Sequence, residues 1–185
     1  MELAPKSPSA SETTITELMI PSYANFGGKI HGGILLGLMD KVAYACAAKH
    51  TGSYCVTVSV ENVEFLAPVE VGQLVSLKAR INYVGRTSLV VGIRVESEDI
   101  KTGQVTHTNT SYFTMVAKDD HNKPTLVRPL LLQNKEEVRR FFEAIIRKNN
   151  RNFFKEEMEK ARINIDLDEE LSRLEGERCV IDFEA

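Results

Sequence analysis

Alternation between hydrophobic and polar residues predicts a series of β-strands in the first two thirds of the chain. It is clearest over residues 74–83, where Val75, Leu77 and Ala79 share one face and polar residues take the other. The same alternation recurs over residues 89–95 after a short turn. Further strands are predicted at residues 13–20, 55–65 and 104–117. Because the last four strands follow one another through short connections, we expect them to form an antiparallel meander.

A long apolar segment between the first strand and the other four predicts a helix. Residues 32–50 are rich in Leu, Met, Ala and Lys, which favour a helix, and the run is long enough for about four turns. Thr51 and Gly52 supply the stop. Apolar residues occupy nearly every face, so we expect the helix to be buried all round. An antiparallel sheet curled around this helix would bury both, which makes the predicted fold class α+β.

Composition divides the 185 residues into three parts. Residues 1–12 are rich in Ser and Pro and predict a flexible leader. Residues 13–130 hold the predicted sheet and helix and form one domain. Residues 131–185 form a charged helical extension, in which Asn134 and Glu137 resemble a capping box and Val138, Phe141 and Phe142 begin an apolar stripe. We expect this stripe to pack on the domain or on a neighbouring subunit.

Charge and targeting signals limit the possible partners and locations. The chain has 23 basic and 26 acidic residues and a formal charge of -3, which argues against a nucleic-acid partner. The first residues lack the apolar core of a secretory signal, and no apolar stretch is long enough for a membrane span, so we expect no stable membrane insertion. Three scattered cysteines without a CxxC pair are typical of a reduced compartment. We therefore predict a cytoplasmic protein.

Asp40 is the polar residue of the apolar helix that most needs an explanation. A charge beside Leu38 and Met39 is costly unless it is paired. One interpretation is that the helix has a single hydrated stripe, which Asp40 shares with Lys41. The other is a general base whose basicity is raised by apolar surroundings. The pattern alone does not decide between the two.

A glycine-rich loop precedes the helix. His31, Gly32 and Gly33 place small residues where free amides and the positive end of the helix dipole point outward. Such an end can polarise a carbonyl and stabilise the oxyanion that develops on it. A tight junction between loop and helix explains the same residues equally well. Asn25, a few residues earlier, offers an amide group and in isolation is a turn residue.

A second candidate binding segment, Gly85-Arg86-Thr87-Ser88, joins two predicted strands. It is either an ordinary hairpin turn or a phosphate contact, with the forked donors of Arg86 assisted by the hydroxyls. Lys118, after the last predicted strand, could add positive charge.

Motifs for other chemistries are missing from the sequence. The histidines are far apart, and Cys46 with His50 offers only two ligands, so we expect no metal site. The sequence contains no serine elbow, no P-loop and no dinucleotide-binding fingerprint. We therefore expect no resident cofactor.

Taken together, residues 13–129 resemble the hot-dog-fold acyl-CoA thioesterases, also called acyl-CoA hydrolases. The resemblance rests on PSYANFGGKIHGGILLGLMDKVAYACAAKH, VTVSVENVEFLAPVEVGQLV, INYVGRTSLVVGIRVE, and the final strand with DDHNKPTLV after it. The first block is the most specific, with Asn-x-x-G, His-Gly-Gly and Leu-Met-Asp in order. The resemblance implies a hot-dog fold, with an antiparallel sheet wrapped around one long buried helix.

The resemblance also implies an acyl-CoA substrate, with Asn25 and Asp40 as catalytic residues. The thioester carbonyl would lie near the first helical amides, Asp40 would deprotonate a water, and Asn25 would orient that water or the carbonyl. Direct attack by Asp40 through an anhydride stays an open alternative. Coenzyme A would enter only as part of substrate and product, and the residues implied to hold it are Gly85, Arg86, Thr87 and Ser88.

Two other functions stay open on the sequence. A hot-dog dehydratase acting on hydroxyacyl thioesters would want a histidine paired with the acid, and His31 is the candidate nearby. A non-catalytic acyl-CoA sensor that controls transcription would be expected to carry a DNA-binding helix-turn-helix. The leader is too short for one, and the extension has no basic excess.

Self-association is the last expectation. A single small sheet leaves strand edges open, so we predict a homodimer built on a continuous sheet, and the resemblance implies a trimer of such dimers. Asp40 lies about 12 Å along the helix axis from Gly32. Asn25 and Asp40 of one chain can therefore hardly meet at one thioester unless the loop folds back or a second subunit contributes. The resemblance favours a site in which Asn25 of one chain faces Asp40 of its partner.

Overall fold

The computed structural model describes residues 3–166, 170–174 and 176–182. Its elements are η1 (Pro8–Ser11), β1 (Thr13–Leu18), η2 (Pro21–Tyr23), α1 (Gly32–Thr51), β2 (Tyr54–Val60), β3 (Leu74–Val84), β4 (Ser88–Glu98), β5 (Val105–Lys118), α2 (Lys135–Asn164) and η3 (Leu171–Leu174). The long helix and the strands expected from the alternation are all present. The α+β fold class is therefore confirmed.

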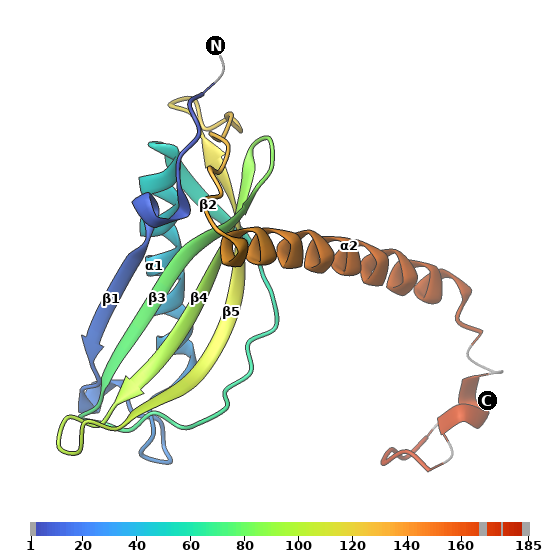
Figure 1. Cartoon of the computed structure of the whole chain (residues 1–185). Helices are drawn as coiled ribbons and strands as arrows, with labels where there is room; N and C mark the ends of the chain where they lie inside the picture. Colours follow the sequence, from blue (N-terminus) through green and yellow to red (C-terminus); the bar gives the residue numbers. More distant parts are fainter. Residues whose placement is uncertain (1–2, 167–169, 175, 183–185) are drawn as a thin grey trace. The chain divides into compact units, whose positions relative to one another are not determined.

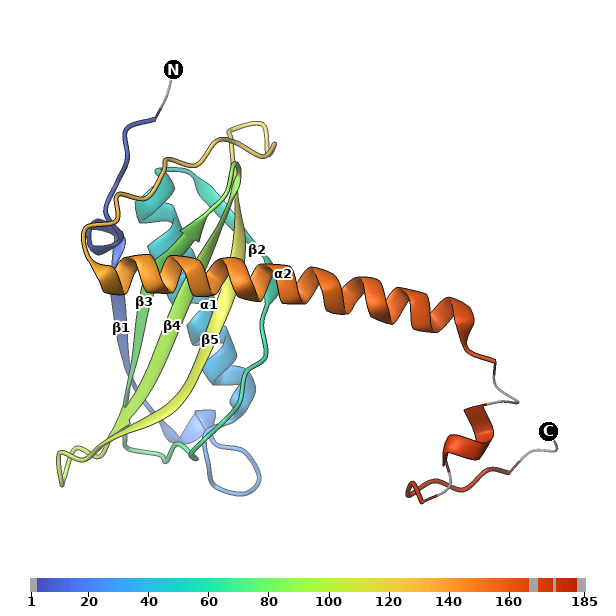
Figure 2. The same cartoon turned by 45° about the vertical axis from the view of Figure 1, so that its right-hand side comes forward.

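The strands form one antiparallel sheet that curls around α1 (Figure 1, Figure 2). Their order is β1-β3-β4-β5-β2, so β2 pairs with β5 and the predicted meander is wrong for β2. The reason is that β2 ends at Val60, earlier than expected, and leaves residues 61–73 to carry the chain back across the sheet. This connection follows β5 on its way: the Glu61 amide donates to the Tyr112 carbonyl and the Leu66 amide to the Thr108 carbonyl, at 2.9 and 2.8 Å.

The core lies between the sheet and one side of α1, which contacts all five strands. The middle of α1 buries Met39 together with the smaller side chains Val42, Ala43, Cys46 and Ala47. On β3 and β4 the predicted alternation places Val75, Leu77, Ala79, Ile81, Leu89, Val91, Ile93 and Val95 in the core.

The helix α1 is not buried all round, contrary to expectation. Leu36, Asp40, Lys41 and Tyr44 are exposed along one side, because the sheet covers only the opposite side. Asp40 and Lys41 therefore lie on an exposed stripe. That stripe also carries two large apolar side chains, Leu36 and Tyr44.

The leader is packed against the domain rather than free. The Lys6 amide donates to the Pro129 carbonyl and the Lys6 carbonyl accepts from the Leu131 amide, at 2.9 and 3.0 Å. Ser11 is fully buried, and its Oγ lies 3.1 Å from Nδ1 of His50. The flexible leader predicted from composition did not anticipate this packing, because a few specific hydrogen bonds, and not overall hydrophobicity, hold the segment.

The capping box predicted at the start of α2 is confirmed in its first half. Asn134 Oδ1 accepts a hydrogen bond from the Glu137 amide at 2.9 Å. Glu137 Oε2 accepts from the amide of Gln133, one residue before the cap, at 2.6 Å.

The beginning of α2 packs on the outer face of the sheet. Glu137 Oε1 accepts from Arg80 Nη2 at 2.6 Å, and the rings of Tyr83 and Phe141 lie 5.0 Å apart. The chain forms two compact units, Met1–Ala144 and Ile145–Ala185. This division lies within α2, and the domain boundary expected at residue 130 stays a prediction.

Candidate active site

Asp40 lies on the exposed side of α1 and accepts a hydrogen bond from β2. Thr57 Oγ1 donates to Asp40 Oδ1 at 2.6 Å. A charged acceptor makes such a bond stronger than one between neutral groups. The bond orients the carboxylate and leaves Oδ2 as the oxygen that can take a proton.

Reasoning from the sequence did not identify Thr57. Cys55 faces the core, so Thr57, two residues further along β2, lies on the side of α1. The alternate residues Tyr54, Val58 and Val60 are exposed. Beyond Cys55, exposed apolar side chains therefore flank Thr57 on an edge strand whose register with β5 shifts between Thr57 and Ser59. These exposed apolar residues are the feature that could have drawn attention to this strand.

Asn25 organises the loop that precedes α1. Its Oδ1 accepts from the amides of Gly27 and Lys29 at 2.9 and 3.2 Å, and its own amide donates to the Lys29 carbonyl at 2.7 Å. In the part of the chain that the structure describes, these hydrogen bonds stay within the loop and none involves Asp40. Because Oδ1 is engaged, Nδ2 is the group of Asn25 that could donate to a ligand.

The residues at the start of α1 are partly engaged with one another. His31 is the N-cap, and its Nδ1 accepts from the Gly33 amide at 3.0 Å. A Cβ on Gly32 would lie 3.2 Å from Cζ of Phe65, so this ring sits close to the helix end. The Gly33 amide is therefore occupied in this conformation. A carbonyl could reach it only by displacing His31, and the predicted oxyanion role of Gly32 and Gly33 stays a prediction.

The predicted coenzyme A residues lie at one end of the sheet. The Gly85 amide donates to the Ser88 carbonyl at 2.7 Å, which closes the turn between β3 and β4. The carbonyls of Arg86 and Thr87 accept from Val127 and Ala117 at 2.9 and 3.0 Å, while the Arg86 side chain is exposed. Ser88 pairs with Val116, so Lys118 at the end of β5 lies at the same end of the sheet.

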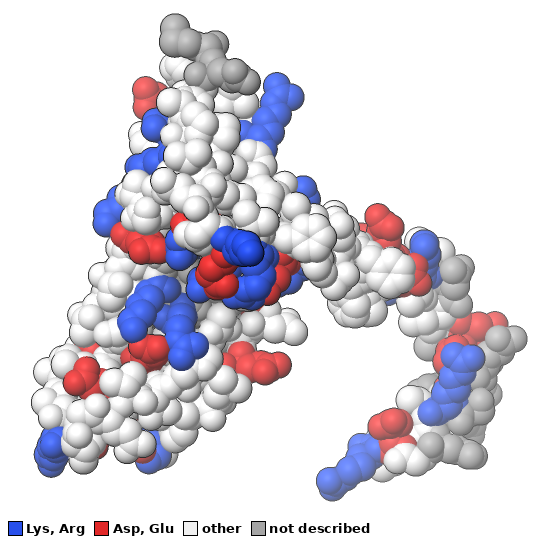
Figure 3. All heavy atoms as spheres, viewed as in Figure 1, with Lys and Arg blue, Asp and Glu red and all other residues white. Residues whose placement is uncertain are grey.

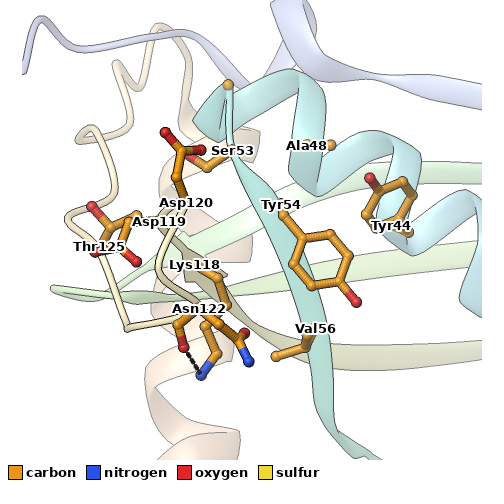
Figure 4. Close-up of a pocket in the computed structure, with 11 residues that line it drawn as sticks. Tyr44, Ala48, Ser53, Tyr54, Val56, Lys118, Asp119, Asp120, Asn122 and Thr125 are labelled. Carbon is orange, nitrogen blue, oxygen red and sulfur yellow. Dashed lines mark hydrogen bonds between the residues drawn. The ribbon is translucent and has the colours of Figure 1, made fainter.

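A hollow of about 1110 Å³ opens beside the end of α1 and the start of β2. Figure 4 shows Tyr44 and Tyr54 on one side of it and Lys118 with Asn122 on the other. The ring centroids of the two tyrosines are 6.0 Å apart, and Lys118 Nζ donates to the Asn122 carbonyl at 3.3 Å. Its lining includes Lys118 but neither Asp40 nor Arg86. This hollow therefore adjoins the predicted site without containing its catalytic residues.

Two of the three cysteine thiols are buried. Burial raises the pKa of the Cys46 thiol to about 12, and burial also raises the pKa of Cys55. Both thiols are therefore protonated and unreactive at neutral pH. Among the residues that the structure describes, no three His, Cys, Asp or Glu side chains gather in a way that could hold a metal ion.

Basic and acidic side chains are interleaved on the outer face of the sheet (Figure 3). Lys78 and Arg94 both pair with Glu96, while Arg80 pairs with Glu12 and Glu137. These hydrogen bonds lower the pKa of the Glu96 carboxyl. Each of these basic side chains therefore has an acidic partner on this face.

Within the described residues, no helix combines the length and the hydropathy needed to cross a bilayer.

Comparison with known proteins places the chain in a family. A model of the thioesterase superfamily matches residues 27–115. Protein VdlD of Helicobacter pylori is 48% identical over 134 residues, which are 72% of this chain and 76% of the relative. An apo-hexameric acyl-CoA thioesterase superposes with a TM-score of 0.78 at 35% identity and covers 89% of this chain and 100% of its own.

An acyl-CoA hydrolase of Staphylococcus aureus, solved with butyryl coenzyme A and coenzyme A, superposes with a TM-score of 0.76 at 28% identity. The match covers 84% of this chain and 95% of that one. Structures of the same enzyme with an aspartate, an asparagine or a threonine replaced by alanine superpose as well. The chain therefore belongs to the thioesterase superfamily, among the hot-dog-fold acyl-CoA thioesterases.

Proposed function

We propose that this protein hydrolyses acyl-CoA to a free fatty acid and coenzyme A, with Asp40 as general base and Asn25 as the orienting residue. The observation that carries the proposal is the hydrogen bond from Thr57 to the exposed Asp40 carboxylate. Asp40 takes a proton from a water, whose oxygen attacks the thioester carbonyl carbon. The tetrahedral intermediate collapses, the C–S bond breaks, and the proton passes from Asp40 to the leaving thiolate.

Residue types and spacing support these roles. The asparagine, aspartate and threonine that were replaced in the S. aureus enzyme follow one another at the same intervals as Asn25, Asp40 and Thr57 do here. The dehydratase alternative is disfavoured because Nδ1 of His31 is already bound to the Gly33 amide. Hydrolysis by water needs no resident cofactor, and the three free thiols agree with a cytoplasmic location.

Two copies complete one site in this proposal. The edge strand β2 exposes Tyr54, Val58 and Val60 beside the exposed stripe of α1. Pairing of β2 with β2 of a second copy would extend the sheet and cover these side chains. Asn25 of one copy would then face Asp40 of the other, and three such dimers would form a hexamer. Arg86 and Lys118 would hold the phosphates of coenzyme A.

Substitution of Asp40 tests the chemistry. Asp40→Asn keeps the shape but removes the base, so kcat in a thiol-release assay should fall by about 10²–10⁴-fold. Asp99→Asn, in the turn between β4 and β5, is the matched control and should leave kcat unchanged. A kcat for Asp40→Asn within a factor of about three of the parent would reassign Asp40 to structure. Formation of an enoyl product without free thiol would instead favour the dehydratase.

Mixed oligomers test the shared site. Asn25→Ala chains and Asp40→Ala chains, unfolded and refolded together, should regain activity because each mixed dimer holds one intact site. If each chain built its own site, every site would carry a lesion and no activity would return. Mass spectrometry confirms that mixed oligomers have formed.

A further inference from the structure

A buried polar chain connects the sheet to the turn of α1 that carries Asp40. Thr108 and Asn109 of β5 are fully buried. Thr108 Oγ1 lies 3.2 Å from the Val95 carbonyl and 2.9 Å from Asn109 Oδ1, so its hydroxyl can donate to either. Asn109 Nδ2 in turn donates to Sδ of Met39 at 3.2 Å. Met39, also fully buried, directly precedes Asp40.

Stability does not explain why Asn109 is there. A thioether is a weak acceptor, so the amide gives up its hydration for a poor bond. Replacing two buried polar partners by apolar groups of similar shape is often neutral or stabilising. An amide retained in such a place is better explained by a need for one particular arrangement.

That arrangement is the rotation and height of α1 on the sheet. The core side of α1 around Asp40 is apolar and includes Leu38, Met39 and Val42. Apolar contacts of this kind are non-directional, so they fix the position of the helix only loosely. A shift by one residue would turn a side chain by about 100° and move it by about 1.5 Å. Hydrogen bonds are directional and can select one position.

Two directional contacts reach successive residues of this turn from two different strands. Asn109 of β5 holds Met39 from the core side, and Thr57 of β2 holds Asp40 from the exposed side. We propose that Asn109 is a positioning residue: it fixes the turn of α1 through Met39 and thereby aims the Asp40 carboxylate at the thioester. This inference rests on the proposed function of Asp40.

Asn109→Leu separates positioning from stability. The variant fills the site with an apolar side chain, so its melting temperature should stay at or above that of the parent, while kcat should fall at least tenfold. KM should stay within twofold, because the coenzyme A residues lie at the end of the sheet. Ser111→Ala is the matched control, since Ser111 is buried on the same strand but donates to the Glu61 carbonyl at 3.1 Å. It should leave kcat within twofold.

Met39→Leu supplies a second, volume-conserving variant, which keeps the test decisive if Asn109→Leu does not fold. It should lower kcat in the same way. The double variant should be no slower than the slower single variant, because both changes break one contact.

Three results would overturn the proposal. One is that Asp40→Asn is inactive while the kcat of Asn109→Leu stays within twofold of the parent. Another is a change in KM alone, which would make Asn109 part of the acyl pocket. The third is a kcat loss that matches a loss of folded protein. An active Asp40→Asn variant would contradict the proposed function itself and is thereby distinguished from these results.

Discussion

Thr57→Val removes the only side-chain hydrogen bond found for Asp40 among the described residues, and its effect can be estimated from the structure. Valine keeps the β-branched shape that suits a strand, so β2 and its pairing with β5 should persist. The donor Oγ1 lies 2.6 Å from Asp40 Oδ1. A hydrogen bond to a charged group contributes about 1.5–3 kcal/mol, and the solvent exposure of this pair argues for the lower end. A loss of about 1.5 kcal/mol of transition-state stabilisation corresponds to a roughly tenfold lower kcat.

The assay is steady-state thiol release, with kcat and KM measured separately and the melting temperature as a check on folding. KM should change little, because Thr57 acts on the catalytic carboxylate and not on coenzyme A. Thr57→Ser retains the hydroxyl and should keep most of the activity. The reasoning is refuted if Thr57→Val lies within twofold of the parent, or if Thr57→Ser loses as much activity as Thr57→Val.

Three further predictions concern other parts of the chain. Burial lowers the pKa of His50 below 6.5, so the unfolded chain binds a proton at this residue more readily than the folded chain does. The free energy of unfolding should therefore be constant above about pH 6.5 and decrease at lower pH. In urea titrations, His50→Gln should make this decrease smaller. Arg86→Ala should raise KM for acyl-CoA more than it lowers kcat, and the rise in KM should be smaller at high salt. An unchanged KM at low ionic strength would show that Arg86 only forms the turn. Phe26→Ala should weaken self-association at least tenfold in sedimentation, because covering a fully exposed phenylalanine contributes about 1.5–3 kcal/mol. Ile100→Ala, at another exposed apolar residue, should leave self-association unchanged. Equal effects of the two variants would exclude Phe26 from the interface.

Local patterns predicted the elements well, and long-range pairing poorly. The alternation in β3 and β4 identified their core faces because both strands have one buried and one outer face. The partner of β2 could not be found this way, because pairing depends on where the strand ends and how the following segment runs. The strand was expected to reach Phe65 but ends at Val60, and the longer connection changes the topology.

The candidate site shows the same limit. Asp40 could be found because a charge in an apolar helix breaks a local pattern. Thr57 breaks no helical pattern, and its role follows from a contact between β2 and α1 that the sequence does not contain. Asn109 is one of several hydroxyl and amide residues on β5, and only its buried contact with Met39 separates it from the others.

The exposed stripe of α1 and the exposed apolar side chains of β2 have one explanation in the proposed dimer. In a single chain, Leu36, Tyr44, Val58 and Val60 leave apolar surface in water, which opposes folding. In the same chain Asp40 faces bulk water, where charges are strongly screened. A second copy laid over this face would bury the apolar side chains and exclude water around Asp40 in one step. The driving force for association and the conditions for catalysis would then come from the same surface, so a chain that cannot associate would lose activity even with every catalytic residue intact.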